Sequence, residues 1–143
     1  MIVVDLNLLI YIVNEDAAHH APARTWWEQC LAEGTDIGLG WAVIVGFVRL
    51  STNPKVFPRP LTPKDAFSIV DGWLEHPAVR SLEPTPAHWE ILKELLEPVG
   101  TAGNLTADAH LAALAIEHGA TLCSADNDFS RFKNLRWSNP LHT

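Results

Sequence analysis

Short apolar runs alternate with longer amphipathic segments along this chain, and the alternation predicts an α/β fold. We expect brief strands at residues 2–4, 36–39, 78–82, 121–124 and 135–137. The segments between them carry apolar residues at helical spacing. Strands that alternate with helices favour a parallel sheet covered on both faces, joined by right-handed crossovers.

Helices are predicted at residues 6–13, 20–33, 41–50, 63–75, 86–97 and 107–118. Their starts carry capping signals, namely Asp5, Thr62-Pro63, Thr85-Pro86 and Thr106. Gly34 and Gly119 mark two helix ends. Residues 6–13 are ambiguous, because an apolar run could also extend the first strand, and Asp5 as a cap favours the helix. Three prolines indicate a loop at 51–61, and 100–104 is expected to be a flexible link.

Length and composition predict one domain, residues 1–143, with enough apolar residues for a core. No apolar run approaches the roughly 20 residues of a transmembrane helix. The first residues lack the features of a signal peptide, so we expect a cytoplasmic protein with no membrane association. Cys30 and Cys123 form no spacing motif and are interpreted as reduced, buried thiols.

The net charge of −7 argues at face value against nucleic-acid binding. That argument weakens if acidic residues hold a cation, because the cation reverses the local sign. Several basic residues also fall in small groups, which are either an RNA-binding surface or ordinary solvated surface: Arg49, Lys55, Arg59, Arg131, Lys133 and Arg136.

Acidic residues stand where predicted strands end or a predicted helix begins. Asp5 follows the first strand, Asp126 follows the fourth with Asp128 close behind, and Asp108 opens a helix. In an open α/β sheet, functional groups collect beyond the carboxyl ends of the strands. Carboxylates that converge there repel one another unless a hard cation such as Mg²⁺ lies between them. Taken singly, each could instead be a helix cap or a turn residue.

Three motifs in order then resemble the PIN domain family: residues 3–9 (VVDLNLL), 104–115 (NLTADAHLAALA) and 121–129 (TLCSADNDF). The chain is most similar to VapC-type toxins, the ribonuclease halves of type II toxin–antitoxin pairs. The resemblance covers almost the whole chain. It implies a PIN-like three-layer α/β/α sandwich with a small, mostly parallel sheet.

The same resemblance implies an Mg²⁺- or Mn²⁺-dependent endoribonuclease that cleaves structured RNA such as tRNA or rRNA. A VapB-type antitoxin would neutralise it, and a homodimer is expected. Residue by residue, Asp5, Asp108 and Asp126 match metal-binding acids, and Asp128 matches a neighbouring catalytic acid. Two further residues match supporting positions, Asn7 and Ser124.

Arg49 is a candidate RNA-binding residue, because a guanidinium suits phosphate, or it pairs with a carboxylate of the acidic pocket. Seven histidines are scattered without zinc-site spacing. His110, two residues from Asp108, is expected on a different helix face in a structural or exposed position.

Gly46 departs from the family pattern, since most members have a glutamate at this position. The predicted helix 41–50 contains no acid, so one well-held metal is a safer expectation than two. The alternative is a degenerate PIN domain that binds RNA or a partner without cutting. Folds that carry out phosphotransfer fit less well. A haloacid-dehalogenase-like site needs Asp-x-Asp after the first strand, where this chain has Asp5-Leu6-Asn7. A receiver domain needs a phosphate-accepting Asp on a middle strand and a Lys near the end of the chain, and neither is evident.

Overall fold

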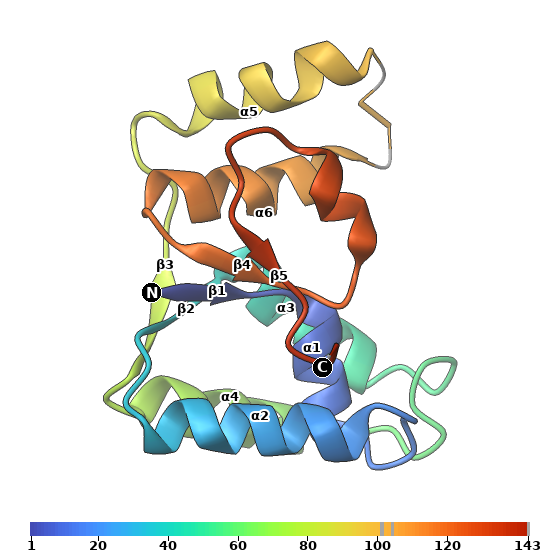
Figure 1. The fold of residues 1–143 in the computed structure, drawn as a ribbon. Coiled ribbons are helices and arrows are strands. Elements are labelled where there is room, and N and C mark those ends of the chain that lie inside the picture. Colours follow the sequence, from blue (N-terminus) through green and yellow to red (C-terminus); the bar gives the residue numbers. More distant parts are fainter. Residues whose placement is uncertain (101, 104, 143) are drawn as a thin grey trace.

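The computed structural model describes residues 1–100, 102–103 and 105–142 and has a five-stranded sheet at its centre (Figure 1). The strands are β1 (Ile2–Val4), β2 (Ile37–Gly40), β3 (Val79–Leu82), β4 (Thr121–Cys123) and β5 (Trp137–Ser138). They lie in the order β3-β2-β1-β4-β5, and each neighbouring pair is parallel. The predicted parallel sheet is confirmed.

Helices cover both faces of this sheet. The described residues form α1 (Leu6–Val13), α2 (His20–Ala32), α3 (Trp41–Ser51), α4 (Pro63–Glu75), α5 (His88–Leu96) and α6 (Leu105–Glu117). Two short 3₁₀ helices follow α5 and β4, η1 (Glu97–Val99) and η2 (Asn127–Arg131). Figure 1 shows α5 and α6 on one side of the sheet and α2 and α4 on the other, which confirms the three-layer sandwich.

The path of the chain places two strand ends together at the centre of the sheet. From β1 the chain moves outward to β2 and β3, and then returns through α5 and α6 to β4 on the other side of β1. Val4 and Cys123 are paired in register, so the residues after them emerge side by side. Such a reversal point is where open α/β sheets bind ligands.

Local sequence signals explain most element boundaries. The Thr62 hydroxyl accepts a hydrogen bond from the Asp65 amide at 3.1 Å, with Pro63 at the first helical position, as predicted. Gly34 and Gly119 have positive φ values of 71° and 64°, where a glycine avoids strain at a helix end.

Several boundaries differ from the prediction, most of them by one residue; β2, for example, is Ile37–Gly40 rather than 36–39. The fifth helix begins at His88 rather than at Pro86 after a Thr85 cap, because the Thr85 hydroxyl accepts from the Ala87 amide and forms a turn first. Helix α6 begins at Leu105, so Thr106 lies in its first turn rather than at its cap. β5 is Trp137–Ser138, not residues 135–137, although it is the predicted edge strand. Thr101 and Asn104, part of the predicted link at 100–104, lie outside the described residues.

The core lies between the sheet and its helices. Several side chains are fully buried there, including Val3, Val4, Leu39 and Leu122. Both cysteines are buried free thiols, as predicted, and burial raises the pKa of Cys123 to about 12. Among the described residues, no helix combines the length and apolar character that crossing a bilayer requires.

Two glycines provide a matched test of this packing. A Cβ added to Gly38 in β2 would overlap Leu82, lying 2.8 Å from its Cγ, whereas one added to Gly72 in α4 would meet nothing within 4 Å. We predict that Gly38→Ala lowers the free energy of unfolding by about 1–3 kcal/mol, because the core is overpacked. Gly72→Ala should raise it by about 0.5–1 kcal/mol through helix propensity. Urea denaturation measures both; equal shifts would contradict the close approach of β2 to Leu82.

Candidate active site

Asp5 is held between the ends of two neighbouring strands. Its amide donates to the Cys123 carbonyl at 2.9 Å. Its Oδ1 accepts from the Leu6 amide at 2.7 Å and so caps α1, as predicted. Its Oδ2 accepts from the Ser124 hydroxyl, also at 2.7 Å. With both oxygens engaged, the carboxylate has a defined orientation at the carboxyl edge of the sheet.

The Ser124 hydroxyl is the hub of this arrangement, and its side chain is fully buried. It donates to Asp5 and accepts from the Asn7 amide nitrogen at 3.2 Å and from the Asp126 backbone amide at 3.0 Å. A hydroxyl has one proton and two lone pairs, so every bonding position is used. The structure therefore brings Asn7 and Ser124, the two predicted supporting residues, into contact with Asp5 and the loop after β4.

Asp126 precedes η2, in the loop after β4, and Asp128 lies in its first turn. Asp126 caps η2 through its Oδ1, which accepts from the Asp128 amide at 2.8 Å. The exposed Asp128 carboxylate pairs with Arg131 at 3.2 Å. Each acid thus uses one carboxylate oxygen to stabilise the local turn. The second oxygen of each carboxylate remains available for other ligands.

Asp108 enters the site from α6, about a hundred residues along the chain from Asp5. The two aspartates line one pocket of about 240 Å³, together with Gly46 and Arg49 of α3. No carboxylate among the described residues lies within ion-pair distance of Arg49. Arg49 was expected either to contact RNA phosphate or to pair with a carboxylate of the acidic pocket. Its position in the pocket wall, without such an ion pair, favours the first alternative.

Burial and like charge raise the pKa values of two of the acids. The pKa of Asp5 is raised mainly by burial and also by Asp126, against the hydrogen bonds from Ser124 and Leu6. The pKa of Asp108 is raised by burial and then by the charges of Asp126, Asp5 and Asp128, with Arg131 opposing. The predicted acids thus lie close enough together for their negative charges to interact, and the nearby positive charge of Arg131 offsets this repulsion only in part.

The donor set fits a hard cation. It consists of carboxylate oxygens, which Mg²⁺ prefers. Across residues 1–100, 102–103 and 105–142, no three His, Cys, Asp or Glu side chains are grouped closely enough to hold a metal ion as a ready-made cage. Mg²⁺ does not need one, because it keeps several waters and binds through one or two carboxylates plus substrate phosphates.

Gly46 lies where α3 approaches α1 most closely. An added Cβ would lie 2.7 Å from Leu6 Cδ2, and Leu6 is itself part of the pocket wall. A larger side chain at this position would have to displace Leu6, so the pocket receives no acid from α3.

His110 was expected on a different helix face from Asp108, in a structural or exposed position, and it does pair with His88 of α5. It lines the same pocket as Asp108, because the pocket follows α6 from Ala107 to Leu114 and so meets both side chains. Its Nδ1 lies 2.9 Å from His88 Nε2, and burial and His88 lower its pKa. The sequence held one signal for this contact: His110 and Glu117 are seven residues apart, so they lie on the same face of the helix.

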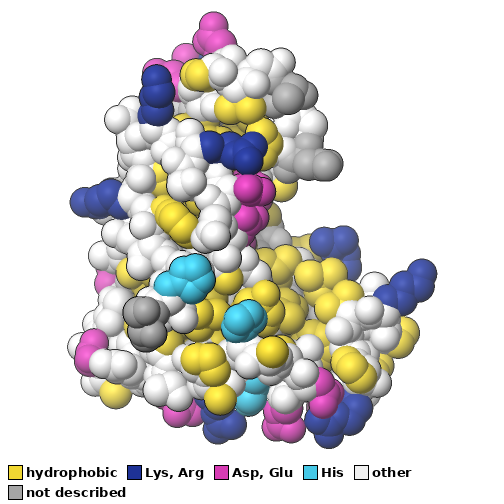
Figure 2. All heavy atoms as spheres, turned by 45° about the vertical axis from the view of Figure 1, so that its right-hand side comes forward, with side chains coloured by type: hydrophobic (Ala, Val, Ile, Leu, Met, Phe, Trp, Pro, Cys, Tyr) yellow, Lys and Arg dark blue, Asp and Glu magenta, His cyan; other side chains and the backbone are white. Residues whose placement is uncertain are grey.

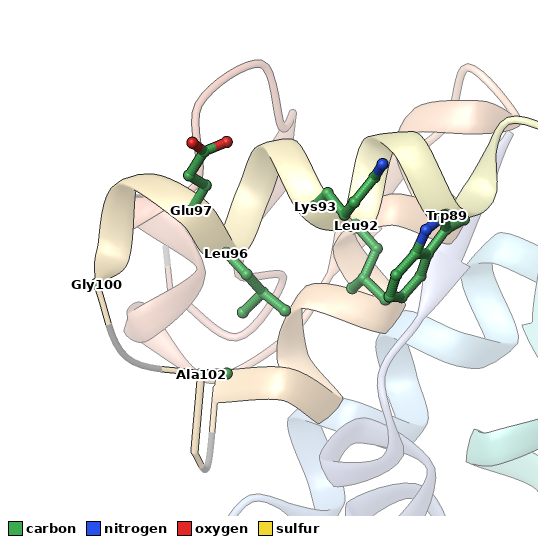
Figure 3. A pocket seen from close by; sticks show the side chains of 7 residues that line it. All are labelled: Trp89, Leu92, Lys93, Leu96, Glu97, Gly100 and Ala102. Carbon is green, nitrogen blue, oxygen red and sulfur yellow. The ribbon is translucent and has the colours of Figure 1, made fainter.

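A larger pocket of about 410 Å³ lies along α5 (Figure 3). Its wall is formed mainly by Trp89, Leu92 and Leu96, with Lys93 lying over the Trp89 ring at 5.8 Å. Glu97 is its one lining acid. This pocket lacks the converging carboxylates of the smaller one, so the smaller one is the candidate active site.

The chain is similar to known proteins over almost its whole length. The sequence model of the PIN domain matches residues 2–135. Ribonuclease VapC37 from Mycobacterium tuberculosis is 44% identical over 140 residues, covering 98% of this chain and 97% of that protein. Ribonuclease VapC33 from the same species is 41% identical over 141 residues, covering 99% of each.

Solved structures show the same fold at lower identity. The structure of VapBC2 from Rickettsia felis, bound to a DNA fragment from its promoter, matches with a TM-score of 0.72 and 22% identity, over 97% of this chain and 98% of that chain. Mycobacterium tuberculosis VapC20, described as a sarcin–ricin loop cleaving toxin, matches with a TM-score of 0.66 and 18% identity, over 95% and 99%.

Removing the Ser124 hydroxyl tests the hub. We predict that Ser124→Ala lowers the free energy of unfolding by about 1–3 kcal/mol, because it leaves the Asn7 amide and the Asp126 amide without their acceptor. Ser130→Ala, an exposed serine on η2, is the matched control and should change it by less than about 0.5 kcal/mol. Chemical denaturation gives both values, and similar losses in the two variants would contradict a hub at Ser124.

Neutralising Asp108 tests the crowding of charge. A raised folded-state pKa means that the carboxyl contributes stability below its unfolded value of 3.8, and that this contribution is lost as pH rises through the folded pKa. In EDTA at pH 7, Asp108→Asn should therefore unfold at higher denaturant concentration than the wild type, and the difference should shrink on acidification. Asp71→Asn, exposed on α4, is the control. A less stable Asp108→Asn protein at pH 7 would contradict the predicted repulsion.

Proposed function

The chain belongs to the PIN domain family, and we propose that it is a VapC-type endoribonuclease toxin that cuts structured RNA with a divalent metal ion. The observation that carries the proposal is that Asp5 and Asp108 line one pocket at the reversal point of the sheet, with Asp126 close enough for its charge to raise the pKa of both. Relatives above 40% identity over almost the full length are named ribonucleases.

Asp5 and Asp108 would hold the metal from the two sides of the pocket, with Asp126 as the third candidate ligand. Bound Mg²⁺ or Mn²⁺ would lower the pKa of a water molecule and neutralise charge on the phosphoryl oxygens. Ser124 and Asn7 keep the Asp5 carboxylate oriented through their hydrogen bonds. Asp128, which is exposed and adjacent to Asp126 in the η2 turn, would orient a water molecule.

RNA would reach this pocket past Arg49. Its guanidinium lies in the pocket wall and can form paired hydrogen bonds with a phosphate. Other members of the predicted basic groups are already engaged: Arg59 with Asp16, and Arg131 with Asp128. These two belong to the solvated surface, so Arg49 is the better candidate for RNA contact.

A VapB-type antitoxin is the proposed protein partner. Trp41 and Val45 on α3 are 47% and 62% exposed, next to the pocket-lining residues Ala42 and Gly46. Figure 2 shows hydrophobic side chains gathered in one broad area, with acidic side chains at its border. An exposed apolar area of this kind marks an interaction surface, and similar solved structures are VapBC complexes. A segment bound there could also place an arginine in the acidic pocket, in competition with the metal.

We further propose a homodimer that acts in the cytoplasm, where its RNA substrates are. The alternative function, RNA or partner binding without cleavage, rests on Gly46, which packs against Leu6 and brings no fourth acid. The same experiment separates the two functions.

Purified protein, freed of antitoxin, would be incubated with total cellular RNA and Mg²⁺, Mn²⁺ or EDTA. We predict discrete fragments that require metal and fall by roughly 100-fold or more in Asp5→Asn, because a metal ligand is lost. Asp71→Asn should cut like the wild type. Folded wild-type protein that cuts no RNA with either metal would contradict the nuclease and favour the binding-only alternative.

A further inference from the structure

A chain of three polar side chains leads from a buried carboxylate to the candidate active site. Glu117 of α6 has a side chain only 1% exposed, and its Oε2 lies 2.9 Å from His88 Nδ1. His88 Nε2 lies 2.9 Å from His110 Nδ1. The two imidazole rings meet edge to face, with centroids 4.8 Å apart. His110 then lines the pocket that contains Asp5 and Asp108.

Glu117 sets the direction of hydrogen bonding along this chain. Its Oε1 accepts from the Thr85 amide, so the carboxylate is fixed at both oxygens. A carboxylate only accepts, and His88 Nδ1 must therefore donate. If the His88 ring is neutral, its Nε2 is an acceptor, His110 Nδ1 carries a proton, and a neutral His110 has its lone pair on Nε2. If His88 is protonated, its Nε2 donates and the pattern on His110 is reversed, so the ring protons of His110 distinguish the two cases.

His110 Nε2 is the only end of the chain left open. No residue in the described part of the protein forms a hydrogen bond with it, and no fully buried side-chain nitrogen or oxygen there lacks a partner. Nε2 is therefore not fully buried, and His110 lines the pocket. A lone pair at this position accepts a hydrogen bond or coordinates a metal ion, and a phosphodiester provides no donor for it at neutral pH.

We propose that His110 Nε2 accepts a hydrogen bond from a ribose 2′-hydroxyl of the bound RNA, next to the cleaved phosphate. The 2′-hydroxyl is the donor by which RNA differs from DNA. His110 is thus a substrate-contacting residue that favours RNA, and His88 and Glu117 are positioning residues that act through it. This inference rests on the proposed ribonuclease function.

The protonation pattern can be measured without metal or RNA. Nitrogen-15 NMR of the histidine rings should show the His110 proton on Nδ1 and a bare Nε2. In Glu117→Gln, the side-chain oxygen still accepts from Thr85, so the NH₂ group faces His88 and donates to it. The proton pattern should then reverse, with the proton of His110 on Nε2. A wild-type His110 protonated on Nε2, or the same pattern in both proteins, would overturn the proposal.

The contact itself is tested with a synthetic RNA that spans a site cut by the wild type. Single 2′-deoxy substitutions are placed in turn at the nucleotides around the cleaved bond. One position should lower kcat/KM by about tenfold, the effect of one hydrogen bond. That penalty should disappear in His110→Ala and persist in His142→Ala, an exposed histidine.

The outcomes separate the two proposals. If the wild type cuts no RNA with metal, the proposed function fails. If it cuts, but no 2′-deoxy penalty depends on His110, the inference alone is overturned. A role of His110 only in folding would lower the cleavage of all substrates equally, which also contradicts the proposed contact.

Discussion

The candidate active site depends on one buried hydroxyl that joins two parallel strand ends. Ser124 uses its proton on Asp5 and both lone pairs on Asn7 and the Asp126 amide. Through it, the end of β1 and the loop after β4 have a common geometry, and Asp5 stays in place although burial and Asp126 disfavour its charge. The hydrogen bonds therefore hold Asp5 at a position where burial and a neighbouring carboxylate disfavour its charge. A bound cation would offset this repulsion without moving the acids.

Much of this could be predicted from sequence, because its causes are local. Asp5 and Asp126 follow apolar runs that predict strands, and the carboxyl ends of parallel strands lie at one edge of the sheet. The cap at Asp5 needed only an aspartate before a helix. The saturation of the Ser124 hydroxyl was not predictable, because it depends on β1 and β4 being neighbours, and this adjacency arises from the long return of the chain from β3.

Contacts between helices are the other feature that could not be predicted from the sequence. Nothing in the sequence indicates that Gly46 packs on Leu6, or that His88 and His110 meet across α5 and α6. The start of α5 was also placed too early, since Thr85 stabilises a turn that resembles a helix cap. These contacts nevertheless shape the pocket: the first leaves no room for a larger side chain at Gly46, and the second holds His110, which lines the same pocket as Asp108.

The central claim is that these carboxylates form a site for a divalent cation. Titration of the purified protein with Mn²⁺, followed by electron paramagnetic resonance of the free ion, tests it without any RNA. The account predicts one bound Mn²⁺ per chain, displaced by Mg²⁺ and lost in an Asp5→Asn/Asp108→Asn double variant that remains folded. Undiminished Mn²⁺ binding in the folded double variant, or no binding by the wild type, would contradict it.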